Sequence, residues 1–417
     1  MTGRGHHESI TPLEDFDRTT LAELAREYFL AAHLIDRAGM PHVVGAYGLD
    51  AMRDCAIDEW MGASPVYTRR MRTLLRFSGD DVATIFKGMQ FDVGAPHQFM
   101  DFRYRVQDHD HGEFWLDSCG ALLDVEPMGE EFTVAMCHDI EDPTFDATAC
   151  ASNPRARMRP IHRPPRQPAD RHPHCHWTVT IEHDADPIPE PAVAIRVATS
   201  RLAATPIPDP DRDTPADAGA VDYADALDPE LRMERFSAPV LVALCDESCT
   251  QGHMLVLSFG DAVEQRFGVE AARDITRKQG IGVAGVDAIR LKRALDLGSD
   301  LASLAAILEL HPAFRPRDYF GFSMELDGSD LTVHLGPGPY RRETVGATWA
   351  SLVTAEDPAL LDAIAHAVDP RLHFESVPGS GPDDLAFRAV LGAEARPEVD
   401  EVTLTKFSTG VEFVFSD

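Results

Sequence analysis

The spacing of apolar residues predicts that the folded part of the chain begins with a helix. The apolar positions recur at intervals of three and four, which places them on one helical face. They are Leu21, Leu24, Ala25, Tyr28, Phe29 and Ala32. Thr20 and Glu23 form a capping-box signature at the start of this face. Further helices are expected as far as Met89.

Alternating apolar and polar residues then predict two pairs of strands with a helix between the pairs. Gly and Asp residues at 108–112 suit the turn of a hairpin. Pro143 follows Glu-Asp at 141–142 and suits the first turn of the intervening helix. In this part of the chain the strands are expected at 102–106, 113–116, 157–161 and 177–182.

The same order of segments occurs a second time. The segment Tyr47–Asp54 matches Phe267–Asp274, and three later groups of matches follow in the same order at offsets of about 214–220. A repeat of this length indicates a duplicated supersecondary unit. In the second copy the strands are expected at 319–325, 331–335, 372–377 and 401–415. The chain is therefore predicted to be α+β and internally duplicated, each half having a helical part and an antiparallel sheet.

The predicted boundaries are residues 18–184 for the first repeat and 236–417 for the second. Residues 185–235 between them are rich in Pro, Asp and Ala. Such a segment buries too little apolar surface to offset its ordering entropy, so it is expected to be mostly a linker. A short helix or strand is expected within 193–202. The two repeats are expected to pack as a pseudo-two-fold pair.

The charge balance narrows the classes of partner. The 417 residues include 69 acidic and 38 basic side chains, a net charge of −31. An acidic surface repels phosphate, which argues against nucleic acid or an anionic membrane as the main partner. There is no apolar run of the roughly 18 residues that a membrane span needs, and no signal-peptide core. We therefore expect a cytoplasmic protein, with a homo-oligomer left open.

Cys and His residues concentrate in three segments of the first repeat. The candidate metal ligands are Cys137, His162, His174 and Cys175. Their counterparts in the second repeat, among them Leu352 and Pro378, cannot bind a metal. Three segments converging on a sheet can build a zinc site of N and S ligands, and iron is also compatible with imidazoles. The alternative is a buried thiol with histidines on the surface.

Three neighbours of these ligands are candidates for catalysis. His138 and His176 could move protons, and Arg163 could bind an anionic substrate beside the metal. Solvated arginines paired with acids are an equally good explanation of the basic run. Cys245, Cys249 and His253 share one helical face in the second repeat, and their largely apolar counterparts favour a core role.

The segment Phe114–Gly120, followed by Cys137-His138, His162 and His174–Trp177, resembles the 4-vinyl reductase domain class. It is also similar to sequences named after 2-amino-thiazoline-4-carboxylate hydrolase. The resemblance covers about residues 20–182 and implies zinc bound by Cys137, His162 and Cys175, with His174 or His138 as fourth ligand. A pocket for a small apolar molecule is implied beside it. His162 departs from the Glu or Cys usual in the class.

Together these features predict a metal-dependent enzyme, a hydrolase or lyase of a small organic molecule. An open coordination position would activate water for such a reaction. The alternative is a metal-binding sensor or accessory protein with a closed, structural zinc.

Overall fold

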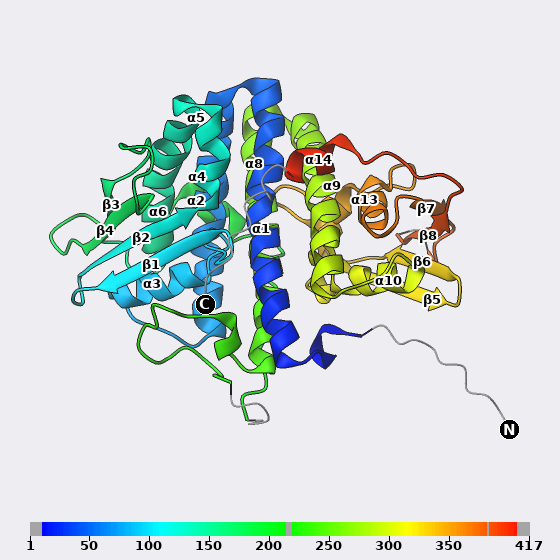
Figure 1. Cartoon of the computed structure of the whole chain (residues 1–417), viewed down its shortest axis with the longest axis horizontal. Coiled ribbons are helices and arrows are strands. Elements are labelled where there is room, and N and C mark those ends of the chain that lie inside the picture. Colours follow the sequence, from blue (N-terminus) through cyan, green and yellow to red (C-terminus); the bar gives the residue numbers. More distant parts are fainter. Residues whose placement is uncertain (1–10, 214–218, 382, 407–417) are drawn as a thin grey trace.

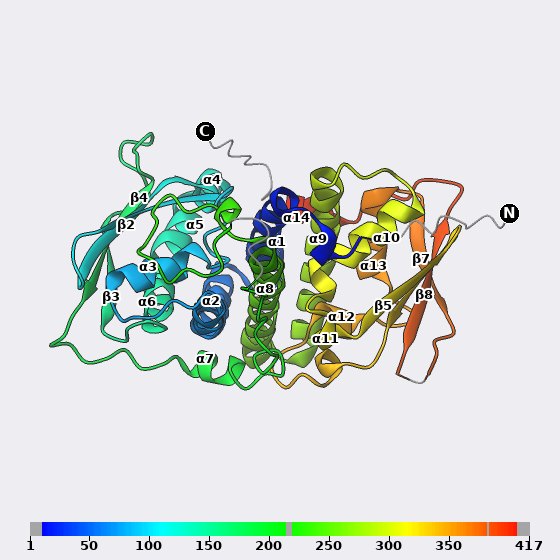
Figure 2. The ribbon, with the colours of Figure 1, turned by 90° about the horizontal axis from the view of Figure 1, so that it is seen from below.

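The computed structural model describes residues 11–213, 219–381 and 383–406. Two antiparallel four-stranded sheets lie on opposite sides of a central layer of long helices (Figure 1). Seen from below, the layers run from one sheet through shorter helices to α2, then α1 with α8, then α9, and out to the second sheet (Figure 2). The prediction of an internally duplicated α+β fold is confirmed.

The first half contains three helices, a hairpin, a helical crossover and a second pair of strands. Its elements are α1 (Arg18–Tyr47), α2 (Leu49–Leu74), α3 (Val82–Gln90), β1 (Met100–Val106), β2 (His111–Cys119), α4 (Gly120–Val125), α5 (Glu130–Val134), the π-helical turn η3 (Ala135–Ile140), α6 (Glu141–Cys150), β3 (Ala156–His162) and β4 (Cys175–Ile181).

The second half follows the same order after the short helix α7 (Ala192–Val197). Its elements are α8 (Ala238–Phe267), α9 (Val269–Ala294), α10 (Leu301–Leu310), α11 (Arg317–Phe320), β5 (Phe322–Asp327), β6 (Asp330–Leu335), α12 (Trp349–Leu352), α13 (Ala359–Val368), β7 (Leu372–Val377), β8 (Leu385–Leu391) and α14 (Asp400–Lys406).

The long helices of the two halves correspond at an offset of 220. Helices α1 and α8 both have 30 residues, and α2 and α9 both have 26. A single glycine joins each pair, with φ of 87° at Gly48 and 88° at Gly268. Residues with a Cβ rarely adopt this backbone conformation, so glycine suits both joints. The offset therefore identifies equivalent positions in the long helices.

The sheets also correspond, with strand orders β1-β2-β4-β3 and β5-β6-β8-β7. A carboxylate fixes the crossover helix to the edge strand in each half. Asp146 accepts a hydrogen bond from the Met158 amide at 2.8 Å, and Asp362 accepts one from the Phe374 amide at 2.6 Å. The offset is 216 at this point, and the shared contact gives the correspondence between α6 and α13.

The structure corrects several predicted boundaries. Helix α1 is capped by Asp17, whose carboxylate accepts from the Thr20 amide at 3.0 Å, so the helix begins before the predicted capping box. Residues 319–320 end helix α11 and do not extend strand β5. Residues 401–406 are helical in α14, while 407–415 lie outside the described residues. Strand β8 was not predicted.

The described parts of the predicted linker, residues 185–213 and 219–235, pack more closely than a linker would. Leu202 and Tyr223 are fully buried, and Leu231 is nearly so. These side chains join the core cluster formed by the long helices and the second sheet. A few large apolar residues, spaced between Pro and Asp, hold this segment on the protein. The short element expected within 193–202 is helix α7.

Two reciprocal ion pairs connect the halves across the central layer. The Arg70 guanidinium donates to both carboxylate oxygens of Glu247, at 2.6 and 2.9 Å. The Arg290 guanidinium contacts Glu27 at the same two distances. Both residues of one pair lie at an offset of 220 from those of the other, so the two contacts are related by the pseudo-two-fold. Bidentate geometry of this kind fixes orientation as well as charge.

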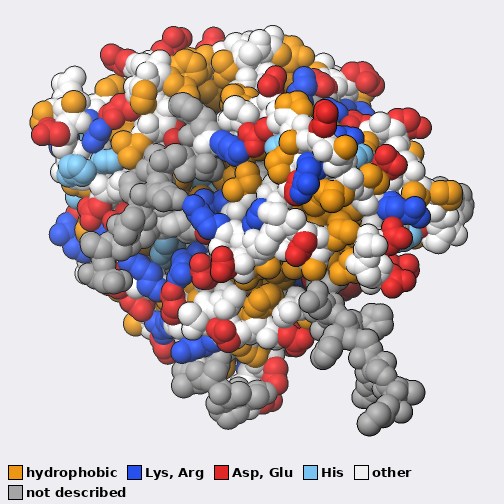
Figure 3. All heavy atoms as spheres, turned by 45° about the vertical axis from the view of Figure 1, so that its right-hand side comes forward, with side chains coloured by type: hydrophobic (Ala, Val, Ile, Leu, Met, Phe, Trp, Pro, Cys, Tyr) orange, Lys and Arg blue, Asp and Glu red, His pale blue; other side chains and the backbone are white. Residues whose placement is uncertain are grey.

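The surface is mixed in character. In Figure 3, acidic and basic side chains are interspersed with small hydrophobic areas over the face that comes forward. None of the helices in the described ranges combines the length and the apolar composition that a bilayer crossing needs.

The central ion pairs lead to a prediction for stability. Arg70→Ala leaves the fully buried Glu247 without its partner, so we expect the free energy of unfolding to fall by about 3–5 kcal/mol. Arg69→Ala is the matched control, because its ion pair with Glu190 is exposed and is worth less than about 1 kcal/mol. Denaturant unfolding of the intact chain measures both. Equal losses in the two variants would contradict the prediction.

Candidate functional site

The first half encloses a cavity between its helices and its sheet. The cavity holds about 840 Å³ of space free of atoms, including its open mouth. Helices α1, α2 and α6, the turn η3 and strands β1 and β2 contribute side chains. The larger apolar ones are Trp60, Met89, Met100, Phe102, Leu116, Met136, Ile140 and Phe145. Mainly apolar walls with a few polar groups are typical of a small-molecule site.

His33 on α1 lines the cavity and has one ring nitrogen without a hydrogen-bond partner among the described residues. Its Nδ1 lies 3.1 Å from the Val93 carbonyl oxygen, which can only accept, so Nδ1 carries the proton. Nε2 is buried and has no hydrogen-bond partner among the described residues. Burial, followed by the charge of Arg37, lowers the pKa of His33 to about 3. The ring is therefore neutral at pH 7.

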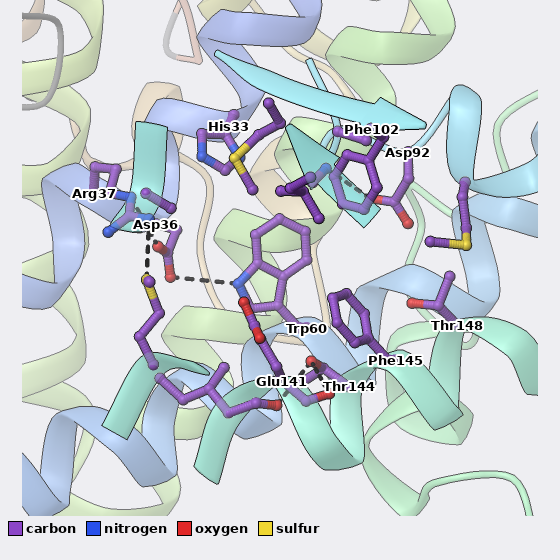
Figure 4. A pocket seen from close by; sticks show the side chains of 18 residues that line it. His33, Asp36, Arg37, Trp60, Asp92, Phe102, Glu141, Thr144, Phe145 and Thr148 are labelled. Atoms are coloured by element: carbon purple, nitrogen blue, oxygen red, sulfur yellow. Dashed lines mark hydrogen bonds and ion pairs between the residues drawn. The ribbon is translucent and has the colours of Figure 1, made fainter. Parts of the chain in front are cut away.

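Asp36 and Arg37 follow one helical turn later. The Trp60 ring N–H donates to Asp36 at 3.4 Å, and the Arg37 Nε lies 3.7 Å from the same carboxylate (Figure 4). Burial raises the pKa of Asp36 against the opposing charge of Arg37. Arg37 also contacts the Met136 sulfur at 3.6 Å. The hydrogen bond to Asp36 fixes the orientation of the Trp60 ring, which Figure 4 shows among the side chains that line the cavity.

Glu141 begins α6, directly after the π-helical turn. Its Oε2 is shielded from solvent and has no hydrogen-bond partner among the described residues. Burial raises the pKa of Glu141 to about 8, opposed by the Arg163 charge. A carboxyl group of this kind keeps its proton at pH 7 and can donate it to a bound molecule. π-Helical turns are frequent at functional sites.

Asp92 provides a second carboxyl group of different acidity. Its Oδ1 accepts from the Tyr67 hydroxyl and from the Gly94 amide, each at 2.7 Å. Burial raises the pKa of Asp92 to about 6, while the two hydrogen bonds oppose the rise. Oδ2 is left to accept a proton. Two carboxyl groups of unlike pKa in one cavity can act as base and acid.

The equivalent region of the second half is filled. At the offset of 220, Trp60 corresponds to Gly280, and a Cβ on Gly280 would lie 2.5 Å from the Trp349 ring. The Trp349 ring is held there by a hydrogen bond from its N–H to Gln279 at 3.1 Å. His253, the equivalent of His33, also bonds a backbone carbonyl, that of Pro312 at 3.0 Å, but through Nε2 and not through Nδ1.

The charged pair on α1 is also lost in the second half. Asp36 and Arg37 correspond to Val256 and Leu257. Because the histidine bonds relate Val93 to Pro312 at an offset of 219, Ala95 corresponds to Phe314. The second half therefore has aliphatic residues in place of this charged pair, and beside Trp349 it keeps a smaller hollow, lined in part by the ion pair of Arg277 with Asp357.

Two of the four predicted metal ligands lie close together. Cys137 in η3 and Cys175 at the start of β4 share a core cluster with Cys119 at the end of β2. Burial raises the pKa of Cys137, and the negative charges of Glu141, Cys119 and Cys175 add to the rise. Burial raises the pKa of Cys119 to about 12. As arranged, the thiols are protonated and pack as small apolar groups.

The other ligands are directed elsewhere. His162 is paired with His176 in the register of β3 and β4, and their ring centroids lie 6.1 Å apart. Alternation along β4 puts the buried Cys175 on the opposite face of the sheet from His176. Cys175 and His162 therefore leave opposite faces and are not brought into one coordination sphere. His174 is buried, and its Nδ1 accepts from the Cys119 amide at 3.1 Å.

The three predicted catalytic side chains are not brought together either. His176 contacts Glu113 at 2.8 Å on the outer face of the sheet. The His138 ring lies 2.7 Å from the Pro164 carbonyl oxygen. Arg163 pairs with Asp142. Each of the three is held by a different neighbouring group, and Arg163 also lies close enough to Glu141 for its charge to act on that carboxyl group.

Within the described part of the chain, no group of three or more His, Cys, Asp or Glu side chains is arranged to hold a metal ion. No family model, curated protein or solved structure matches the chain. The zinc site and the resemblance to the 4-vinyl reductase domain class stay predictions.

The cavity residues escaped the sequence analysis because they belong to no motif. A signal was nevertheless present in the repeat. On the first long helix, Asp36-Arg37 corresponds to Val256-Leu257 of the second copy, and on the second long helix Trp60 corresponds to Gly280. A charge retained in one copy of a core position and replaced by an aliphatic residue in the other marks a candidate site.

The raised pKa of Glu141 leads to a prediction for pH dependence. The folded chain holds this proton more tightly than the unfolded chain, so the group's stabilising effect is lost as pH rises from about 4.5 through about 8. Relative to wild type, Glu141→Gln should gain free energy of unfolding over this range, by up to about 1.4 kcal/mol per unit of pKa shift. Denaturant unfolding at several pH values measures the difference.

Glu130→Gln is the control, because Glu130 is exposed on α5. Its difference from wild type should not change over the same range. If the free energies of unfolding of wild type and Glu141→Gln changed in parallel with pH, the pKa of Glu141 would not be raised and the prediction would be wrong.

Elemental analysis of the purified chain tests the zinc prediction. A site that includes Cys175 predicts that Cys175→Ser loses metal and Cys55→Ser keeps it, because Cys55 lies in a separate helical cluster. Equal metal contents in the two variants would show that the predicted set of zinc ligands is wrong.

Proposed function

We propose that the first half binds a small organic molecule in the cavity and acts on it by acid–base chemistry, as a hydrolase or lyase. The observation that carries the proposal is the contrast between the two copies. The same scaffold encloses a hollow lined by the charged pair Asp36-Arg37 in one half, and it has Trp349 with the aliphatic Val256 and Leu257 in the other. Beside the hollow, His33 Nε2 and Glu141 Oε2 are buried without a hydrogen-bond partner among the described residues. Buried polar atoms without partners cost stability, so their retention beside a cavity favours a ligand that satisfies them.

Glu141 and Asp92 would provide the acid and the base. Glu141, with a pKa of about 8, would protonate a leaving group or a developing carbanion at neutral pH. Asp92, with a pKa of about 6, would take a proton from substrate or from water through Oδ2. Both reactions need this pair of proton transfers, which is why hydrolase and lyase stay together in the proposal.

The metal-dependent route predicted from the sequence would require Cys137, His162, His174 and Cys175 to approach one ion. Their present positions on opposite faces of the sheet do not fit a single ion. The proposed reaction therefore uses only the side chains of the cavity.

Filling the cavity tests the binding part of the proposal. Ala95→Phe places in the first half the residue that the second half has at Phe314. Compounds from a small-molecule library that raise the melting temperature of wild type should not raise that of Ala95→Phe. Met128→Phe is the control, because Met128 is exposed and remote from the cavity lining. Compounds that stabilise Ala95→Phe as well as wild type bind elsewhere and would count against the proposal.

Mass spectrometry of the stabilising compounds after incubation tests the chemical part. Glu141→Gln should slow their conversion about 10²–10⁴-fold, because it removes the proton donor and keeps the shape. Compounds recovered unchanged from wild type would favour the second candidate, a binding or sensor protein that uses the same cavity.

A further inference from the structure

We propose that the ligand of this cavity is a small cationic amine carried on an aromatic or apolar body. The inference rests on the proposed function of the same site and specifies its substrate class. Three features of the lining residues support this ligand class: an excess of carboxyl groups, a histidine nitrogen that can only accept a hydrogen bond, and a set of aromatic rings.

The carboxyl groups outnumber the cations that face them. Asp36, Asp92 and Glu141 line the cavity, and Arg37 is the one guanidinium among its lining residues. Arg37 lies 3.7 Å from Asp36, so one carboxylate compensates its charge. Asp92 has no further cation among the lining residues, and the charge that most opposes the raised pKa of Glu141 comes from Arg163, outside the lining. A bound cation would favour the ionised forms of Asp92 and Glu141, whereas a bound anion would meet three carboxyl groups and one guanidinium already engaged.

A fourth carboxyl group lies behind the wall. Glu59 precedes Trp60 on α2, is fully buried, and has no hydrogen-bond partner for either oxygen among the described residues. Burial raises the pKa of Glu59, and the charge of Asp36 adds to the rise. A bound cation on this side of the cavity would oppose that rise, whereas a bound anion would add to it.

The acceptor nitrogen adds a directional requirement. His33 donates through Nδ1 to the Val93 carbonyl, so its unpartnered Nε2 can only accept a hydrogen bond. A protonated primary amine has three N–H donors and no acceptor. It can therefore satisfy His33 Nε2 and carboxylate oxygens together. A carboxylate ligand has acceptors only and would leave this nitrogen without a donor.

The aromatic rings suit the rest of the molecule. Trp60 from α2, Phe102 from β1 and Phe145 from α6 surround the space shown in Figure 4. Such rings bury an apolar body, and their faces attract a cation within about 6 Å of the ring centre. A molecule with one ring and a short alkylamine chain combines both features at a size that the cavity admits.

Calorimetric titration of the intact chain with three probes of similar shape tests the inference. The probes are 2-phenylethylamine, 2-phenylethanol and 3-phenylpropionate, which are cationic, neutral and anionic at pH 7. We expect the amine to bind at least about tenfold more tightly than the alcohol, because a desolvated cation gains both charged hydrogen bonds and contact with the rings. The anion should bind most weakly.

Variants separate charge from shape. Asp36→Asn and Glu141→Gln should each reduce the preference for the amine over the alcohol and leave the affinity for the alcohol nearly unchanged. Asp50→Asn, on the exposed part of α2, is the matched control and should change neither. Having two cavity variants keeps the test available if one of them folds poorly.

The outcomes distinguish this inference from the proposed function. If the alcohol or the anion binds as tightly as the amine and Ala95→Phe abolishes that binding, the cavity is a ligand site and the amine assignment is wrong. If the amine binds and Ala95→Phe does not weaken it, the amine occupies another site and the assignment is also wrong. If none of the probes binds, the assignment of a single-ring amine fails, and the library screen on Ala95→Phe still decides the proposed function.

Discussion

The paired ion contacts of the central layer hold α1 and α2 of the first half against α8 and α9 of the second. Glu27 on α1 and Arg70 on α2 each find their partner in the other half, and both contacts are bidentate. Because a buried charge without its partner is costly, the two halves are constrained to one relative position. The constraint reaches the cavity directly, since His33 and Asp36 lie on the same helix as Glu27, within the three turns that follow it.

Because the chain is duplicated, the fixed position of the two halves affects what each copy must keep. Once each half supplies the other with a packing face, both copies must keep their long helices, their glycine joints and their sheets, but within the described residues only one copy keeps a cavity of this size. The second half shows what the scaffold does without one. Trp349 packs against Gly280, and Val256 and Leu257 replace the charged pair. Filling a cavity and removing buried charge both favour stability.

Sequence reasoning was effective where a pattern has a fixed period. The strand at 372–377 and most of the other strands were predicted from alternation, and the duplication from a nearly constant offset. It failed where the outcome depends on tertiary partners. Residues 401–406 have a strand-like composition yet are helical in α14, which packs on α9. The metal ligands were chosen by type, but Cys175 and His176 are neighbours in one strand and must face opposite ways. Only the register of β3 with β4 shows which face His162 shares.

The candidate site could not be predicted from local patterns, because its residues are common types and only their burial makes them unusual. Asp36, Glu141 and Asp92 are common side chains, and their chemistry comes from burial that no local pattern encodes. In a single-copy protein, carboxyl groups of this kind can be structural. Here the second copy shows that the scaffold folds with aliphatic residues in place of Asp36 and Arg37, so the fold itself does not require that charged pair. Groups that weaken the fold and that one copy has discarded are best explained by a role in binding or chemistry in the other.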